Sequence, residues 1–189
     1  MSSQAVSYWL LPGPKAQIKL DQLSVLAFER ISFGLGVCML PPHITLYSHP
    51  LDAAQPNSQE QIIDRLQQLA DSQHPVLLYP KAIEATRMFT QSLILRFNSE
   101  ALADLHPWFL QLCLSSPNEL GYKLDPHLSL LYSQAPLELR RERAKGLVPP
   151  TDPLSFESVS VVSHPLKIET PADIAVCTAL YECSLVSSA

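Results

Sequence analysis

The chain has 189 residues, of which 47% are hydrophobic and 16% are charged, a composition typical of a folded domain with its own core. The formal net charge of -5 argues against a protein whose main task is to bind the phosphate backbone of long nucleic acid. The sequence shows neither a basic leader followed by an apolar run nor an apolar stretch long enough to span a membrane. We therefore expect a cytoplasmic monomer, built as a single domain over residues 1–189 and without a membrane partner.

Seventeen prolines against five glycines divide the chain into short elements. Periodicity and turn signals predict strands at 7–11, 43–47, 75–84, 90–97, 127–132, 155–163 and 174–185. They predict helices at 20–33, 58–70, 99–114 and 137–146, the third bent near Pro107. Because no linker separates the elements, this pattern predicts one compact α+β domain.

Several common kinds of site are missing from the sequence. Neither the GxxxxGK[ST] nor the GxGxxG phosphate loop occurs. The four cysteines form no CxxC pair, so we expect no metal site and no cofactor, and we interpret the cysteines as buried free thiols. They are Cys38, Cys113, Cys177 and Cys183.

The most informative feature is a short motif that occurs twice. Residues 42–48 read PHITLYS and residues 126–133 read PHLSLLYS. Side chains alternate between the two faces of a strand, so His43 and Thr45 share one face and His127 and Ser129 share another. Each predicted strand therefore sends aliphatic residues into a core, and a histidine with a hydroxyl residue to the other side.

Two histidines facing one substrate can divide the work of phosphoryl transfer. The neutral imidazole takes a proton from an attacking water, and the protonated imidazole gives one to the leaving oxygen. The hydroxyls of Thr45 and Ser129 are suited to hold phosphoryl oxygens as charge develops on them. We interpret the other four histidines as structural: His49 and His164 as turn residues in Ser-His-Pro, and His74 and His106 as loop or helix-surface residues.

The paired motifs resemble the signature of the 2H phosphoesterase superfamily. The contexts PHITL and PHLSLLYS, with an aromatic-x-Gln stretch at Phe89 and Gln91, resemble its cyclic phosphodiesterase branch in plants and fungi. The resemblance implies a bilobal α+β fold of two pseudo-symmetric antiparallel sheets, with helices outside and a central cleft. It implies an enzyme of the 2′,3′-cyclic-nucleotide phosphodiesterase type that acts without metal. Its substrates would be ADP-ribose 1″,2″-cyclic phosphate and nucleoside 2′,3′-cyclic phosphates, the latter opened to 2′-phosphates.

Carried over residue by residue, the resemblance makes His43 and His127 the acid and base, and Thr45 and Ser129 the phosphate ligands. We favour His127 as the base and His43 as the acid, although the sequence does not decide this. Candidate contacts for a base or ribose are Tyr47, which is in phase with His43, and Phe89, Gln91 and Tyr132. Tyr132 is out of phase with His127 unless a bulge intervenes.

Two other functions remain open. One is a related enzyme that ligates or hydrolyses 2′-5′ linkages in RNA, against which the acidic charge argues. The other is a module that binds a cyclic phosphate without turnover, for which two titrating groups have no purpose. The expected partner is a small-molecule cyclic phosphate, either a nucleotide or an ADP-ribose derivative, and not a long nucleic acid.

Overall fold

The computed structural model describes residues 4–32, 36–51, 58–115 and 121–186. The strands are β1 (Gln4–Pro12), β2 (Val37–Cys38), β3 (Ile44–Pro50), β4 (Val76–Leu78), β5 (Pro80–Ala85), β6 (Leu93–Phe97), β7 (His127–Ser133), β8 (Leu154–Pro165) and β9 (Thr178–Ser184). The helices are α1 (Pro14–Ile31), α2 (Ser58–Ser72), α3 (Glu100–Ser115), α4 (Leu137–Ala144) and α5 (Pro171–Ala175), with a 3₁₀ turn η1 (Phe89–Gln91).

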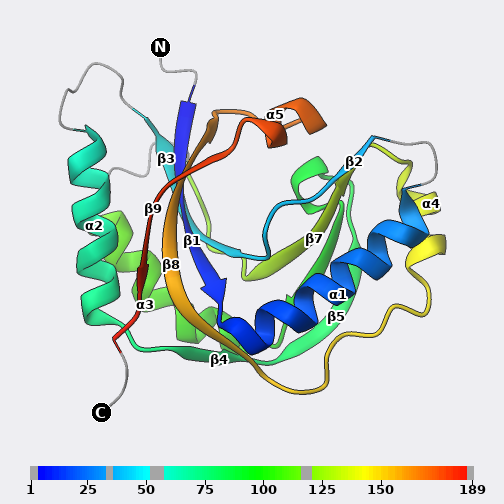
Figure 1. Cartoon of the computed structure of the whole chain (residues 1–189), viewed down its shortest axis with the longest axis horizontal. Helices are drawn as coiled ribbons and strands as arrows, with labels where there is room; N and C mark the ends of the chain where they lie inside the picture. The colour runs from blue at the N-terminus through cyan, green and yellow to red at the C-terminus, as the bar shows by residue number, and fades with distance from the viewer. Residues whose placement is uncertain (1–3, 33–35, 52–57, 116–120, 187–189) are drawn as a thin grey trace.

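The strands form two antiparallel sheets (Figure 1). The first has the order β3-β1-β8-β4, with β9 paired to β8, and the second has the order β2-β7-β6-β5. The first copy of the motif lies on β3 and the second on β7, and these two strands contact each other where the sheets meet. This arrangement confirms the predicted α+β fold of two antiparallel sheets.

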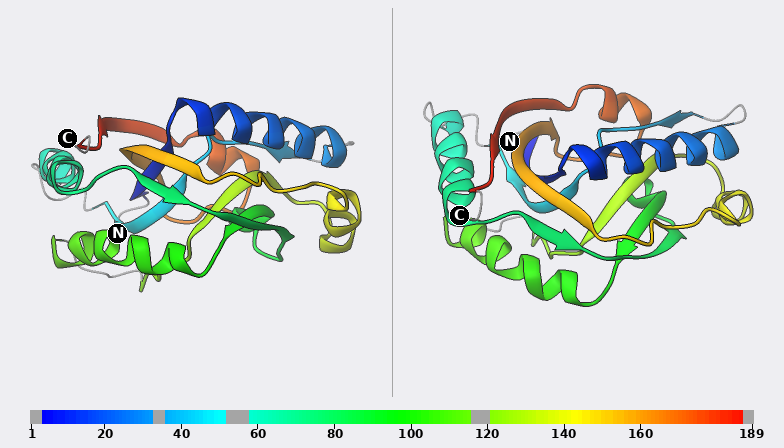
Figure 2. Two further views of the ribbon diagram at one scale, coloured as in Figure 1. Left: turned by 90° about the horizontal axis from the view of Figure 1, so that it is seen from below. Right: turned by 60° about the horizontal axis from the view of Figure 1, so that its bottom comes forward.

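Helices cover the outer sides of the sheets, as Figure 2 shows from two further directions. Helix α1 packs mainly against β7, whereas α2 packs against β8 and β9 and α3 against β3. Along α2 the apolar residues Ile62, Leu66 and Leu69 recur at helical spacing and are at most 2% exposed, which is the pattern expected of an amphipathic helix on a sheet. In the described part of the chain, none of the helices is both long and apolar enough to cross a membrane.

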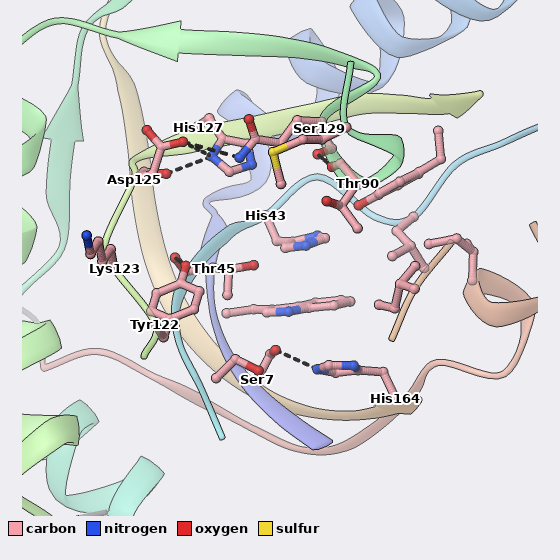
Figure 3. A pocket seen from close by; sticks show the side chains of 18 residues that line it. Ser7, His43, Thr45, Thr90, Tyr122, Lys123, Asp125, His127, Ser129 and His164 are labelled. Atoms are coloured by element: carbon pink, nitrogen blue, oxygen red, sulfur yellow. Dashed lines mark hydrogen bonds and ion pairs between the residues drawn. The ribbon is translucent and has the colours of Figure 1, made fainter. Parts of the chain in front are cut away.

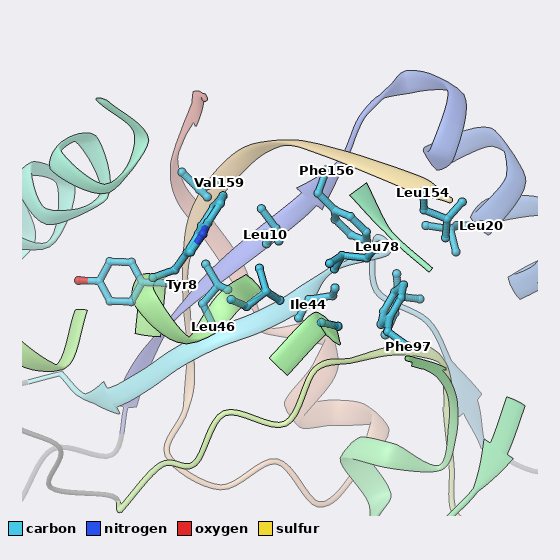
Figure 4. Close-up of a cluster of buried hydrophobic side chains, with 14 of the residues drawn as sticks. Tyr8, Leu10, Leu20, Ile44, Leu46, Leu78, Phe97, Leu154, Phe156 and Val159 are labelled. Carbon is cyan, nitrogen blue, oxygen red and sulfur yellow. The ribbon is translucent and has the colours of Figure 1, made fainter. Parts of the chain in front are cut away.

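The apolar face of each motif strand forms part of the core. Ile44 and Leu46 of β3 are fully buried, and so is Leu128 of β7. Figure 4 shows Ile44 and Leu46 beside Leu10 of β1 and Phe156 of β8. Burying a side chain of this size contributes about 1.5–3 kcal/mol, so these contacts hold the opposite, polar face of each motif strand in place.

Several expected boundaries are wrong. Helix α1 begins at Pro14 and not at residue 20, because proline suits the first position of a helix. It ends at Ile31, and Phe33, the expected end, lies outside the described residues. The expected strand 75–84 is two strands, β4 and β5.

The end of the chain also differs from the expected strand at 174–185. Thr170 and Asp173 form a capping box that begins α5, so β9 starts only at Thr178. Similarly, the strand expected from Thr90 begins with η1, and β6 starts at Leu93.

Candidate active site

Both copies of the motif open into one cleft of about 360 Å³ (Figure 3). His43 and Thr45 lie at the start of β3, and His127 and Ser129 at the start of β7. The structure therefore brings together all four residues that the sequence predicted as catalytic or phosphate-binding. The remaining lining residues are Ser7, Trp9, Leu40, Ser48, Met88, Thr90, Gln91, Tyr122, Lys123, Asp125, Tyr132, His164, Ile168 and Ile174.

The two imidazoles are held in the same way. His43 Nδ1 lies 2.7 Å from the carbonyl oxygen of Pro41, and His127 Nδ1 lies 2.6 Å from that of Asp125, in each case two residues earlier. A carbonyl oxygen only accepts, so Nδ1 carries the hydrogen in both rings and Nε2 is left for a ligand. The proline before each histidine restricts the residue before it to an extended conformation, which directs this carbonyl.

The surroundings of His43 favour its neutral form. Its ring stacks on the indole of Trp9, with centroids 3.5 Å apart and planes at 9°, and the residue is 7% exposed. Burial lowers the pKa of His43 to about 4, against the opposing effect of the Pro41 carbonyl. Positive charge on His127 or His164 lowers this pKa further, so each of these two rings lies within electrostatic reach of His43.

The surroundings of His127 contain an anion. The carboxylate oxygen Oδ2 of Asp125 lies 3.4 Å from His127 Nδ1. The hydrogen bond from His127 lowers the pKa of Asp125 to about 2, so this group is charged at neutral pH. Arg96 pairs with the same carboxylate, and Gln91 Nε2 donates to it at 3.2 Å. The carboxylate is thus fixed where it compensates the positive charge that His127 gains with a proton.

The two hydroxyl residues differ in their hydrogen bonds. Ser129 Oγ donates to the carbonyl oxygen of Thr90, 2.8 Å away. The hydroxyl of Thr45 makes no hydrogen bond with the described part of the chain, while its carbonyl accepts from the Tyr122 hydroxyl at 2.8 Å. The Thr45 hydroxyl is therefore ready to bind a ligand, and Ser129 has to turn away from Thr90 to donate to one.

Each motif strand contains a β-bulge at the same place. On β3, Tyr47 pairs with Tyr8 and Thr45 with Trp9, so Leu46 is an extra residue. On β7, Leu131 pairs with Leu93 and Ser129 with Ile94, so Leu130 is an extra residue in the same way. Each bulge lies three residues after the histidine and reverses which residues face the cleft beyond it.

The bulges determine which of the predicted aromatic residues face the cleft. The expectation that Tyr47 faces the cleft is wrong: Tyr47 is fully buried and packs against Tyr8, Phe109 and Tyr122. Tyr132 does line the cleft, as the sequence allowed if a bulge intervened.

Of the other two candidate contacts, one lines the cleft and the other does not. Gln91 lines the cleft, where it supports Asp125. Phe89 is not among the lining residues and packs against Tyr132, with ring centroids 6.0 Å apart.

Sequence reasoning missed several polar residues of the cleft. His164 was interpreted as a turn residue, and Ser7 and Asp125 were given no role. The signal for Asp125 was its place two residues before His127, where the first motif has Pro41. The signal for His164 was the repetition of Ser-His-Pro at the ends of β3 and β8.

No family model matches the sequence, and no curated protein is significantly similar to it. Solved structures do match over nearly the whole chain. TT0787 of Thermus thermophilus has a TM-score of 0.59 at 16% identity, covering 96% of this chain and 97% of its own. LigT of E. coli complexed with 3′-AMP has a TM-score of 0.54 at 12% identity, covering 97% and 98%. Usb1 of Kluyveromyces marxianus, also solved with uridine monophosphate, has a TM-score of 0.53 at 13% identity, covering 95% and 98%.

These structures are 2H phosphoesterases, and at such low identity the similarity establishes the fold. The chain thus has the 2H phosphoesterase fold that the paired motifs predicted.

Proposed function

We propose that this chain, with its 2H phosphoesterase fold, is a phosphodiesterase that opens cyclic phosphate esters by acid–base catalysis between two histidines. The observation that carries the proposal is that His43 and His127 both offer Nε2 to one cleft, beside the hydroxyls of Thr45 and Ser129. The proposed substrates are nucleoside 2′,3′-cyclic phosphates and ADP-ribose 1″,2″-cyclic phosphate. The 3′-AMP and uridine monophosphate bound by the similar LigT and Usb1 structures support a ligand of nucleotide size.

The surroundings of the two rings support His43 as the base. Because His43 is neutral in its buried position, Nε2 has a lone pair that takes a proton from water. The water oxygen then forms a bond to phosphorus. This direction is the reverse of the one favoured from the sequence, and the burial of His43 is the reason for the change.

His127 then acts as the acid. The bond between phosphorus and one ring oxygen of the cyclic ester breaks, and that oxygen takes a proton from His127 Nε2. The anionic Asp125 stabilises the positive charge that His127 carries before this step. His43 ends the step protonated and His127 neutral, and exchange with solvent restores both.

The phosphate ester is held by the two hydroxyls. Thr45 and Ser129 lie two residues after the histidines on the same strand faces, so their hydroxyls approach the non-bridging oxygens. Hydrogen bonds that strengthen as charge develops on these oxygens accelerate the reaction by about 10²–10³-fold each.

The test is hydrolysis of a panel of substrates by the purified protein with chelator present. The panel contains ADP-ribose 1″,2″-cyclic phosphate, the four nucleoside 2′,3′-cyclic phosphates and a 2′-5′ oligonucleotide, with products separated by chromatography. We expect cyclic phosphates to be opened to 2′-phosphates, and His43→Ala and His127→Ala each to abolish turnover. His106→Ala removes an exposed histidine of α3 outside the cleft and serves as the control.

Four outcomes would contradict the proposal. Loss of activity with chelator would indicate a metal-dependent reaction, and activity retained in both histidine variants would exclude the acid–base pair. Cleavage of the 2′-5′ linkage alone would identify the related RNA activity, and binding without turnover would identify a binding module.

A further inference from the structure

A buried serine–histidine pair in the cleft has no part in the proposed acid–base chemistry. Ser7 lies on β1 two residues before Trp9, and His164 lies near the end of β8, where its backbone pairs with Ala5. Ser7 Oγ and His164 Nε2 are 2.7 Å apart. The two residues are only 4% and 8% exposed, although both line the cleft. In the view of Figure 3, His43 lies between this Ser7–His164 pair and His127.

The hydrogen atoms of the pair point into the protein. His164 Nδ1 donates to the carbonyl oxygen of Pro165 at 2.8 Å, so Nε2 carries a lone pair in the neutral ring. Burial lowers the pKa of His164 and so favours this neutral form. The hydroxyl of Ser7 therefore donates its hydrogen to His164 Nε2.

A second serine beside the pair also donates its hydroxyl hydrogen to a group of the protein. Ser48 is the cross-strand partner of Ser7 on β3, and it also lines the cleft. Its hydroxyl donates to the carbonyl oxygen of Val6, 3.1 Å away. With both hydroxyl hydrogens used inside the protein, the lone pairs of the two serine oxygens are what remains for a ligand.

We infer that the Ser7–His164 pair, with Ser48, forms a binding subsite for a hydroxyl or amino group on the non-phosphate part of the substrate. This inference rests on the proposed function, because it assigns the direction in which the sugar and base extend from the phosphate. The catalytic end of the cleft offers donors, the Thr45 hydroxyl and the protonated His127, which suit phosphoryl oxygens. The opposite end offers acceptors, which suit O–H and N–H groups.

The inference predicts which substrate groups matter. Adenosine 2′,3′-cyclic phosphate carries two groups of donors away from the phosphate, the 5′-hydroxyl and the 6-amino group. One analogue lacks the hydroxyl (5′-deoxyadenosine 2′,3′-cyclic phosphate) and another lacks the amine (purine riboside 2′,3′-cyclic phosphate). We expect one of the two to show a kcat/KM about tenfold lower than adenosine 2′,3′-cyclic phosphate, as the loss of one hydrogen bond to a buried acceptor predicts.

The decisive measurement is whether this discrimination depends on Ser7. In Ser7→Ala we expect the ratio of kcat/KM between parent and analogue to fall to near one. Ser160→Ala is the matched control, because Ser160 is an equally buried serine of the neighbouring strand β8 whose hydroxyl donates to Tyr181 outside the cleft. A discrimination that is absent in the unaltered protein, or unchanged in Ser7→Ala, would overturn the inference and leave the pair a purely structural link between β1 and β8.

Two additions keep the test decisive. If Ser7→Ala does not fold, His164→Gln and His164→Ala replace it, since glutamine retains an acceptor for the Ser7 hydrogen and alanine does not. We then expect discrimination to persist in the glutamine variant and to disappear in the alanine variant, and equal behaviour of the two would overturn the inference.

Calorimetric binding of the matching 2′-monophosphates repeats the comparison without turnover. Discrimination in binding by a protein that cleaves nothing would contradict the proposed function and still support the subsite. Failure to bind any of the three monophosphates, together with failure to cleave, would overturn both.

Discussion

The buried state of His43 makes a quantitative prediction about stability at low pH. In the unfolded chain His43 binds a proton near its ordinary pKa of 6.5, whereas in the folded protein burial lowers this pKa to about 4. Between these values the unfolded chain binds more protons than the folded protein. The stabilising contribution is therefore fully present above pH 6.5 and is lost as the pH falls towards 4.

The size of the effect follows from the shift. One unit of pKa corresponds to about 1.4 kcal/mol, so a shift from 6.5 to about 4 corresponds to a loss of about 3 kcal/mol by pH 4. His43→Gln removes the titrating group while keeping a polar side chain of similar length. We expect the free energy of unfolding of the unaltered protein to fall by about 3 kcal/mol more than that of His43→Gln between neutral pH and about pH 4.

The assay is urea unfolding of both proteins at several pH values, with the difference between the two curves plotted against pH. His164, whose pKa burial also lowers, is present in both proteins, so most of its contribution is common to the two curves. Parallel curves would refute the reasoning, because they would mean that His43 binds its proton equally well in both states. The histidine could then not be held neutral by its burial, and the assignment of His43 as the base would lose its support.

Three further substitutions test separate parts of the structure. Asp125→Asn removes the anion beside His127, so kcat for cyclic phosphate hydrolysis should fall about tenfold or more with little change in KM. An unchanged kcat would exclude this role. Thr45→Val keeps the side-chain shape without the hydroxyl. We expect kcat/KM to fall about 10²-fold while the melting temperature stays nearly constant. A fall in melting temperature that accompanies the loss of activity would instead indicate a structural role. Arg140→Met should lower the free energy of unfolding, measured in urea, by about 3 kcal/mol, because the buried guanidinium donates to the carbonyl oxygens of Thr86 and Ala135. Arg140→Lys keeps a donor and should lower this free energy by less. Equal losses of free energy in the two variants would contradict the hydrogen-bond explanation.

The parts of the fold that follow local rules could be predicted from the sequence. The apolar stripe of α2 and the alternation around His43 and His127 are local patterns, and the structure has a helix and two strands there. The sequence pattern missed the start of α1, because Pro14 can follow the end of a strand and can also be the first residue of a helix. A proline has both meanings, and only the following residues separate them.

The bulges at Leu46 and Leu130 could not be predicted in this way. A bulge adds one residue on one strand relative to its partner, so it exists only in the pairing of β3 with β1 and of β7 with β6. Strict alternation placed Tyr47 in the cleft for this reason. The recurrence of the bulge at the same distance from each histidine shows that the motif repeats a backbone shape as well as a set of side chains.

His164 illustrates how a correct local interpretation can miss a function. The expected turn chemistry is present, since His164 Nδ1 donates to the carbonyl oxygen of the next residue, as His49 Nδ1 does in the other Ser-His-Pro. What the sequence lacked was the position of β1 between β3 and β8, which brings Ser7 to within hydrogen-bond distance of His164. The side chain therefore lines the cleft because of long-range pairing.

The surroundings of the two histidines explain how a motif that occurs twice can supply one base, His43, and one acid, His127. Proline before the histidine and a carbonyl two residues before it fix both rings alike, so the repeated residues account for the shared geometry. The difference arises at the residue that supplies this carbonyl: Pro41 in the first copy has no charge, and Asp125 in the second adds a carboxylate. On the other side, Trp9 of β1 covers the ring of His43, and the resulting burial favours the neutral ring. The chemical asymmetry thus depends on Asp125, which lies outside the repeated motif, and on strand β1, which the motif does not contain. It depends less on the exchange of Thr45 for Ser129.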